Sequence, residues 1–304
     1  MNLFFTGLNG LVGSRLAHLL GHSQFSKSLQ ISSFIRAPSY ASHTIPSRSI
    51  ASKSYFGSCD SVSDLSAAIQ SAKPDLIVHI AQHRYTPNLL SALETYSSTC
   101  SLLIVGTTGV FSHFPSCSTQ YKYGEQLLTL SGYDFCLVRP SIIYGSKLDK
   151  NLHKLFERIR SCKTIILPDG GKSKFQPVYY KDVSFALFLL ISKWLENTIF
   201  ANRFINLTGP DTLTLANICN VIATLSNVSS VRCLNLSIDF CYSATSVLSY
   251  LLGDFAPIVP EQILRLREDK VYKSHWHLVD PTFRPTSFED GIRSMIKSYY
   301  PPSF

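Results

Sequence analysis

The chain has 304 residues, which is enough for one large domain or for one domain with a smaller appendage. Hydrophobic residues make up 45% and charged residues 16% of the sequence, a balance that excludes an intrinsically disordered protein. The 28 Lys and Arg residues outnumber the 20 Asp and Glu residues, but they are scattered, and no basic run interleaved with aromatics predicts a nucleic-acid surface.

The cysteines and the apolar segments bear on the cellular compartment in which the protein is expected. The eight cysteines form no CxxC pair and have no histidine at metal-ligand spacing, so we expect no metal site. Several lie in apolar runs such as DFCLVRP and ANICNVIATL, where a free thiol packs as a small core residue. Met1 leads into an apolar run without a basic segment, and Lys193 and Glu196 interrupt the longest apolar stretch. We expect a cytoplasmic protein with no membrane span.

Short apolar segments alternate with helical ones through the first half of the chain. The expected strands are NLFFT (2–6), LQISSFIR (29–36), DLIVHIA (75–81), SLLIVGT (101–107) and DFCLVRP (134–140). The expected helices are LVGSRLAHLLG (11–21), VSDLSAAIQSA (62–72), NLLSALETYSS (88–98) and YGEQLLTLSG (123–132). This alternation predicts an α/β protein with a Rossmann-type, doubly wound parallel sheet.

Two regions depart from this rhythm. Residues 37–54 are rich in Ser and Pro without a helical period, which predicts a loop. After Gly145 the elements become shorter, with helices expected around 151–160 and 182–194 and another beginning at Thr214. We therefore expect a Rossmann domain over residues 1–145 and a smaller mixed α/β substrate-binding portion over residues 146–304, with elements returning to the sheet.

A glycine-rich turn at the start of the chain carries the strongest functional signal. In FFTGLNGLVGSRLAHLL, Gly7 permits a tight turn, Gly10 leaves room for a pyrophosphate, and Gly13 lets the helix pack close to the strand. The N-terminus of the following helix offers free N–H groups and a positive dipole end to phosphate. The turn lies between an expected strand and an expected helix, which predicts dinucleotide binding. The candidate contacts here are Thr6, Gly7, Asn9, Gly10, Leu11, Val12 and Gly13.

The glycine spacing, one residue wider than in the commonest dehydrogenase fingerprint, resembles that of the extended short-chain dehydrogenase/reductase family, of the NAD-dependent epimerase/dehydratase type. Similar segments run nearly end to end: Cys59-Asp60, DLIVHIA (75–81), GTTGVF (106–111), LVRPSIIYG (137–145), QPVYYKDV (176–183), NLTGPDTLTL (206–215) and RPTSFEDGI (284–292). The resemblance implies that Thr107 holds the substrate oxygen and that Asp60 meets the adenine amino group. It also implies cofactor contacts from Ala81, Gln82, Pro140 and Ser141.

The end of the second strand bears on the choice of cofactor. An acidic residue there would bind the ribose 2′-hydroxyl of NAD, whereas an arginine would meet the 2′-phosphate of NADP. Arg36 occupies this place, and no acidic residue follows until Asp60. A guanidinium binds phosphate well, so NADP is favoured. NAD stays open, because Arg36 can also be a solvated residue at a strand end.

The tyrosine and lysine of the resembled family, four residues apart, have no clear counterpart here. Tyr121 and Lys122 are adjacent, and Glu125 stands four residues after Tyr121. In one register Cys117 takes the tyrosine position and Tyr121 the lysine position. With one deletion Lys122 takes the lysine position and Ser118 the tyrosine position. Neither register gives the pair.

Three interpretations of this departure stay open. Tyr121 donates a proton from a shifted position, helped by Lys122 or Lys147; or another acid, His83, His113 or Tyr85, acts from the loops after the fourth and fifth strands; or the site binds nucleotide without turnover. His79, within an apolar strand, is expected to be a core histidine. The candidate catalytic residues are Thr107, Tyr121 and Lys122, and the candidate substrate contacts are His83, Thr108, His113, Asn151 and Gln176.

The segment from Arg139 to Val183 resembles the substrate side of the family. Asn151 is expected at a helix start, as a cap or a ligand contact. Lys172 and Lys174 either meet a diphosphate or form a hairpin tip. These features favour an NADP-dependent oxidoreductase, epimerase or dehydratase that acts on a nucleotide sugar. The alternative is a non-catalytic NADP(H)-binding scaffold or redox sensor. No nucleic-acid or membrane partner is expected, and a homodimer is left open.

Overall fold

The computed structural model describes residues 1–36, 50–95, 99–149, 152–162, 164–196, 200–228, 231–253 and 260–299. The chain divides into two compact units, each built from three separate segments. The first unit comprises Met1–Pro140, Tyr180–Leu207 and Ser274–Arg284. The second takes in the described residues of 141–179, 208–273 and 285–304.

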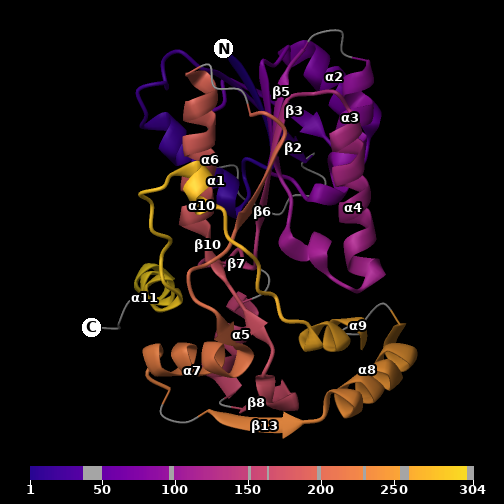
Figure 1. The fold of residues 1–304 in the computed structure, drawn as a ribbon, viewed down its shortest axis with the longest axis vertical. Coiled ribbons are helices and arrows are strands. Elements are labelled where there is room, and N and C mark those ends of the chain that lie inside the picture. The colour runs from indigo at the N-terminus through magenta and orange to yellow at the C-terminus, as the bar shows by residue number, and fades with distance from the viewer. Residues whose placement is uncertain are drawn as a thin grey trace. The chain divides into compact units, whose positions relative to one another are not determined.

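A seven-stranded parallel sheet forms the centre of the first unit (Figure 1). Its strand order is β11-β6-β5-β4-β1-β2-β3, and every neighbouring pair is parallel. The strands are β1 (Asn2–Thr6), β2 (Gln30–Arg36), β3 (Lys53–Gly57), β4 (Leu76–His79), β5 (Ser101–Val105), β6 (Phe135–Pro140) and β11 (Arg203–Leu207). Strand β4 is buried at every position, as expected for a parallel sheet covered on both faces. The predicted Rossmann-type fold is confirmed.

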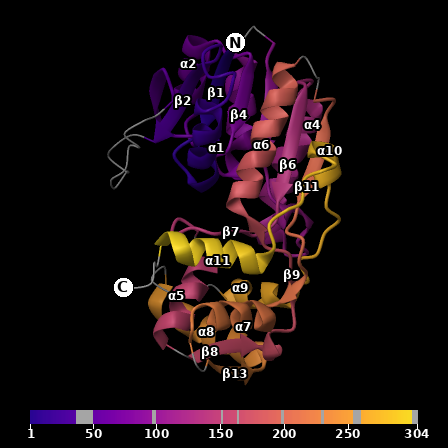
Figure 2. The same cartoon turned by 90° about the vertical axis from the view of Figure 1, so that its left-hand side faces the viewer.

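Helices cover both faces of this sheet. On one face lie α1 (Leu11–Gly21) and α6 (Tyr180–Leu195), which pack side by side, and on the other lie α2 (Val62–Ala72), α3 (Thr86–Glu94) and α4 (Pro115–Leu130) (Figures 1 and 2). The Ser184 hydroxyl donates a hydrogen bond of 3.0 Å to the Val12 carbonyl, which ties α6 to the start of α1. The short α10 (Trp276–Val279) packs against β11.

The structure corrects two predicted boundaries. The segment expected to be a loop, 37–54, contains the first two residues of β3, while residues 37–49 lie outside the described ranges. Strand β3 was missed because it is an edge strand with few apolar residues. One of these, Tyr55, packs against Phe4 with ring centroids 6.1 Å apart. Helix α4 begins at Pro115 and not at Tyr123, because a proline fits the first turn of a helix.

The core of the first unit consists of side chains from the sheet and the helices that cover it. Phe4, Leu65, Ile77, Leu89 and Leu102 are fully buried members of one such cluster. Cys136 in β6 and, in the second unit, Cys219 are each 1% exposed, which confirms the expectation that they pack as core residues. None of the helices in the described ranges has the length and apolar character needed to span a membrane.

The second unit is built from three small sheets and several helices. Strand β7 (Ile143–Tyr144) pairs with β10 (Val178–Tyr179), β8 (Thr164–Pro168) with β13 (Arg232–Leu236), and β9 (Lys174–Phe175) with β12 (Leu213–Thr214). Its helices are α5 (Leu152–Cys162), α7 (Leu215–Leu225), α8 (Ile238–Leu252), α9 (Pro260–Leu264) and α11 (Phe288–Tyr299). Short helical turns are η4 (Asp169–Gly171) and η6 (Arg265–Arg267).

Candidate active site

The glycine turn after β1 lies where a pyrophosphate is expected. Gly7 has a φ of +76°, and a Cβ there would lie 2.8 Å from the Ala81 nitrogen. A Cβ on Gly13 would lie 2.7 Å from the Leu8 Cα, so helix α1 needs glycine at this point. A Cβ on Gly10 would meet only the Gly7 carbonyl oxygen, at 3.2 Å. The turn requires glycine at Gly7 and Gly13 for packing, whereas a Cβ on Gly10 would have one tight contact and no second one within 4 Å.

The N-terminus of α1 is suited to an anion. Gly10 is its N-cap in an extended conformation, no side chain caps the helix, and its first turn contains no acidic residue. The first N–H groups of a helix have no intrahelical partner, and the helix dipole is positive at this end. Leu11 and Val12 provide such N–H groups, while Asn9 is half-buried beside them. These residues therefore fit the pyrophosphate of a dinucleotide.

The remaining cofactor candidates lie at the carboxyl ends of the strands. Arg36 ends β2 and is exposed, with Gly57 of β3 as its strand partner, and Asp60 is exposed just beyond β3. The Thr6 hydroxyl is bonded to His79 Nδ1 at 2.7 Å and accepts the Ala81 N–H at 3.4 Å, so it ties β1 to the end of β4. Gln82 is exposed beside Ala81, and Pro140 is the buried last residue of β6.

His79 is fully buried, in agreement with its expected place in the core. Its pKa is lowered to about 3, mainly by burial and also by nearby His83, while a hydrogen bond with the Gln82 main chain acts in the opposite direction. The imidazole is therefore neutral in the folded protein at ordinary pH.

This burial predicts an acid-sensitive contribution to stability. In the unfolded chain His79 takes up a proton below about pH 6.5, whereas in the folded chain its pKa is lowered to about 3, so it takes up the proton only near that pH. The stabilising contribution is therefore complete above the unfolded pKa and is lost as pH falls, by about 1.4 kcal/mol per pH unit. Urea unfolding of wild type and His79→Gln at pH 8, 6 and 5 measures this, and the stability gap should shrink with acid. A gap that stays constant would contradict the expectation.

Thr107 lies on the turn after β5, and Tyr121 of α4 lies against this turn. The Thr107 hydroxyl accepts the Gly109 N–H at 3.1 Å and caps the short helix η3 (Thr108–Phe111). A Cβ on Gly109 would lie 3.2 Å from Cε2 of Tyr121, so the phenol ring lies directly against this turn. The His83 ring stacks on the Tyr121 ring with centroids 5.9 Å apart and planes 24° apart. The structure thus brings Thr107, Tyr121 and His83 together.

Other candidates stand apart from this group. Lys122 is exposed on α4, one residue and about 100° of helix rotation from Tyr121. His113 is exposed, whereas Thr108 is buried within η3. Arg84 is a cation near Tyr121. Its guanidinium donates a hydrogen bond of 2.7 Å to the Tyr85 hydroxyl, which raises the Arg84 pKa, and Asp60 and Tyr121 also raise that pKa.

Glu125, four residues after Tyr121, is committed to an ion pair. The Arg139 guanidinium on β6 donates to both carboxylate oxygens of Glu125, through Nε at 2.7 Å and through Nη2. Both side chains are nearly buried, 13% exposed for Arg139 and 10% for Glu125. The Arg139 guanidinium also lies 4.4 Å from the ring centroid of Phe204. The position that would hold the family's lysine after Tyr121 is therefore occupied by a carboxylate that is paired with Arg139.

Two candidates in the second unit, Ser141 and Gln176, form hydrogen bonds with the main chain of the same unit. The Ser141 hydroxyl donates to the Gln176 carbonyl, and the Gln176 side-chain oxygen accepts the Tyr272 N–H at 2.7 Å. Asn151, the third candidate in this part of the chain, lies outside the described residues.

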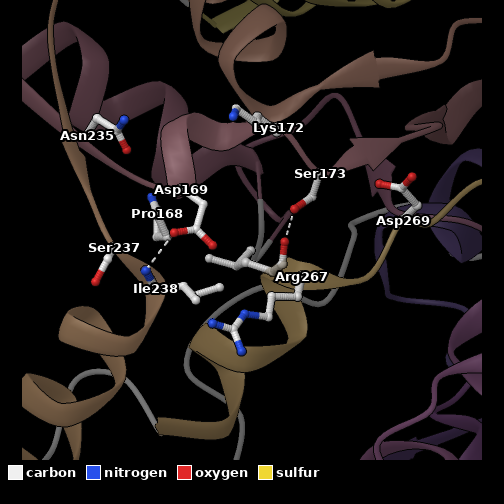
Figure 3. Close-up of a pocket in the computed structure, with 10 residues that line it drawn as sticks. Pro168, Asp169, Lys172, Ser173, Asn235, Ser237, Ile238, Arg267 and Asp269 are labelled. Atoms are coloured by element: carbon white, nitrogen blue, oxygen red, sulfur yellow. Dashed lines mark hydrogen bonds between the residues drawn. The ribbon is translucent and has the colours of Figure 1, made fainter.

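The second unit also contains a cavity of about 730 Å³ between η4, the end of β13 and η6. Figure 3 shows Lys172 and Arg267 around it together with the carboxylates of Asp169 and Asp269. Asp169 accepts the Ile238 N–H at 2.9 Å, and Asp269 accepts the Lys174 N–H at 2.8 Å. Sequence analysis singled out Lys172 but missed Arg267 and Asp269, because nothing local in the sequence indicates that residues almost 100 positions apart share a cavity.

No family model matches the chain. A 99-residue stretch, 33% of the chain, is 34% identical to the mitochondrial NADH-ubiquinone oxidoreductase 40 kDa subunit of Neurospora crassa, and the match spans 24% of that subunit. Among solved structures, a nucleoside-diphosphate-sugar epimerase from Staphylococcus aureus superposes with a TM-score of 0.73 at 15% identity, covering 96% of this chain and 100% of that one. The fold is that of the nucleotide-sugar epimerases.

Two further structures extend this epimerase fold to related enzymes. UDP-glucuronic acid 4-epimerase from Bacillus cereus gives a TM-score of 0.71 at 14% identity, covering 98% of this chain and 100% of that one. The dTDP-4-dehydrorhamnose reductase of Bacillus anthracis, solved with NADP, gives 0.63 at 14% identity, covering 98% and 99%. The fold expected from the resemblance to extended short-chain dehydrogenase/reductases is thereby confirmed.

Proposed function

We propose that the chain is a member of the extended short-chain dehydrogenase/reductase family that binds NADP(H) and acts as an oxidoreductase, epimerase or dehydratase on a nucleotide sugar. The N-terminus of α1, which follows the glycine turn with neither a side-chain cap nor an acidic residue in its first turn, is the observation that carries the proposal. Arg36 at the end of β2 supports NADP over NAD, because a guanidinium binds the extra phosphate.

In this proposal, side chains of the protein bind the substrate oxygen and exchange its proton. A bound nicotinamide dinucleotide would supply a hydride donor or acceptor. Thr107 would hold the substrate oxygen, and Tyr121, whose ring lies against the Thr107–Gly109 turn, would exchange the hydroxyl proton. Lys122 would contribute a distant positive charge from the exposed face of α4.

The cavity in the second unit supports the proposed substrate class. Lys172 and Arg267 place two cationic side chains at its lining, of which Arg267 also forms an exposed ion pair with Asp239 at 2.7 Å. Cations of this kind bind a diphosphate. Asp169 and Asp269 at the same lining are acceptors for hydroxyl and amide groups of a nucleoside. We therefore propose that this cavity takes the nucleotide part of the substrate.

A non-catalytic NADP(H)-binding protein is the second candidate. The observation that favours it is the Glu125–Arg139 ion pair, which leaves Tyr121 without an ammonium four residues further along the helix. The relative from Neurospora crassa is by name a subunit of a larger assembly, so this alternative includes a structural role of that kind.

One experiment separates the two candidates. NADPH and NADH binding are measured by nicotinamide fluorescence, and turnover is followed with UDP-, GDP- and dTDP-sugars for wild type, Tyr121→Phe and Thr107→Ala. The enzyme proposal expects tighter NADPH than NADH binding and turnover that falls about 100-fold in Tyr121→Phe. Binding without turnover of any sugar supports the second candidate. Failure to bind either dinucleotide contradicts both.

A further inference from the structure

His83 packs between Gly106, which follows β5, and Gly124 of α4. It begins the short helix η2 (His83–Tyr85), soon after β4, and is 4% exposed. A Cβ on Gly124 would lie 3.5 Å from His83 Cε1, and a Cβ on Gly106 would lie 3.7 Å from Cδ2. These are ordinary van der Waals distances, so both glycine backbones lie close to the imidazole and enclose it on two sides.

The imidazole is fixed in orientation and in charge. Its Nδ1 is bonded to the buried Thr86 hydroxyl at 2.9 Å, and its Nε2 is also buried. The His83 pKa is lowered to about 4: burial is the main cause and Arg139 adds to it, while a hydrogen bond with the Tyr121 main chain acts in the opposite direction. The ring is therefore neutral at physiological pH.

This fixed, neutral ring lies against the proposed proton donor. Tyr121 has the imidazole stacked on one side, with centroids 5.9 Å apart, and the Gly109 turn at its edge. We infer that His83 is the positioning residue of Tyr121: held by Thr86, it keeps the phenol ring against the turn that carries Thr107. This inference rests on the function proposed for Tyr121.

The arrangement explains how a tyrosine can be placed without the partner lysine of the resembled family. A hydrogen bond or ion pair from a neighbouring ammonium would orient a phenol from its oxygen end. Here the flat face of an aromatic neighbour orients the ring, and stacked aromatic pairs have preferred geometries of this kind. Loss of such positioning lowers the rate of the chemical step more than it weakens binding, because a small misplacement is costly for reacting groups.

The test compares His83→Leu, which removes the ring, with His83→Phe, which keeps a ring but loses the bond to Thr86. Protein with carbon-13 in its tyrosine rings is studied by NMR, and Tyr121→Phe assigns the Tyr121 signal. We expect His83→Leu to shift the Tyr121 signal and to lower kcat about tenfold, with KM and the NADPH Kd within twofold. His83→Phe should keep the signal near its wild-type position and restore most of kcat. The exposed His22→Leu is the control and should match wild type.

Two results would overturn the inference: a Tyr121 signal unchanged in His83→Leu, or a kcat loss in His83→Leu that His83→Phe does not restore. Should His83→Leu fail to fold by circular dichroism, His83→Asn takes its place. It removes the ring but keeps a polar group for Thr86, so it should shift the Tyr121 signal, and an unchanged signal counts against the inference. If wild type binds NADPH but turns over no sugar, the enzyme proposal fails, and the NMR comparison alone still decides whether His83 positions Tyr121.

Discussion

Gly10→Ala should weaken NADPH binding at least tenfold while lowering the stability of the protein much less than Gly13→Ala does. The added methyl group would meet the Gly7 carbonyl oxygen at 3.2 Å, a tight contact that requires a small local adjustment. It would also add bulk at the N-cap of α1, where the main chain has to approach a pyrophosphate closely. Fluorescence titration with NADPH measures the affinity, and thermal unfolding without ligand measures the stability.

Gly13→Ala is the matched control for this prediction. Its methyl group would lie 2.7 Å from the Leu8 Cα, a main-chain atom that cannot move without shifting the glycine turn. This variant should lose thermal stability even without ligand, by about 1 to 3 kcal/mol, the usual cost of overpacking. If Gly10→Ala bound NADPH as tightly as wild type, the glycine turn would not be the pyrophosphate site.

Removing either partner of the Glu125–Arg139 pair should destabilise the protein strongly. Both side chains are nearly buried, so Glu125→Leu leaves a guanidinium without its carboxylate and Arg139→Met leaves a carboxylate without its guanidinium. Each single variant should lower the free energy of unfolding by about 3 kcal/mol, because an uncompensated charge then stays buried. Urea unfolding monitored by circular dichroism measures the change.

The double variant and an exposed pair test the origin of this effect. Glu125→Leu combined with Arg139→Met should be more stable than either single variant, because no charge is left unpaired. Arg293→Met breaks the exposed pair with Glu289, whose side chains are 60% and 55% exposed, and should change stability by less than about 1 kcal/mol. A double variant as unstable as the sum of the singles would show that lost packing, not unpaired charge, is responsible.

The sequence predicted the parts of the structure that depend on local patterns. Gly7 follows β1 and Gly13 lies in the first turn of α1, and both have the steric role that the spacing predicts, whereas the role of Gly10 stays a prediction. Strand β3 escaped detection because this edge strand has few apolar residues, of which Tyr55 packs against Phe4.

Contacts between distant parts of the chain could not be read from local patterns. Glu125 appeared only as a break in the expected Tyr–Lys spacing, because nothing near it shows that Arg139 on β6 faces α4. The packing of His83 likewise involves Gly106 and Gly124, which come close to its ring only once β5 and α4 are packed. For the same reason the sequence grouped His83 with His113, although one is buried and the other exposed.

The contact between α6 and α1 has a consequence for the order of folding. The Ser184 hydroxyl reaches the Val12 carbonyl across 172 positions of sequence, and β11 extends the sheet beside β6. During synthesis, the face of α1 that packs on α6 stays exposed until the ribosome has released residues well past 184. Such distant pairings slow folding and leave apolar surface uncovered for longer. The glycine turn is therefore among the first segments synthesised, yet it receives its full support only after about two thirds of the chain has emerged.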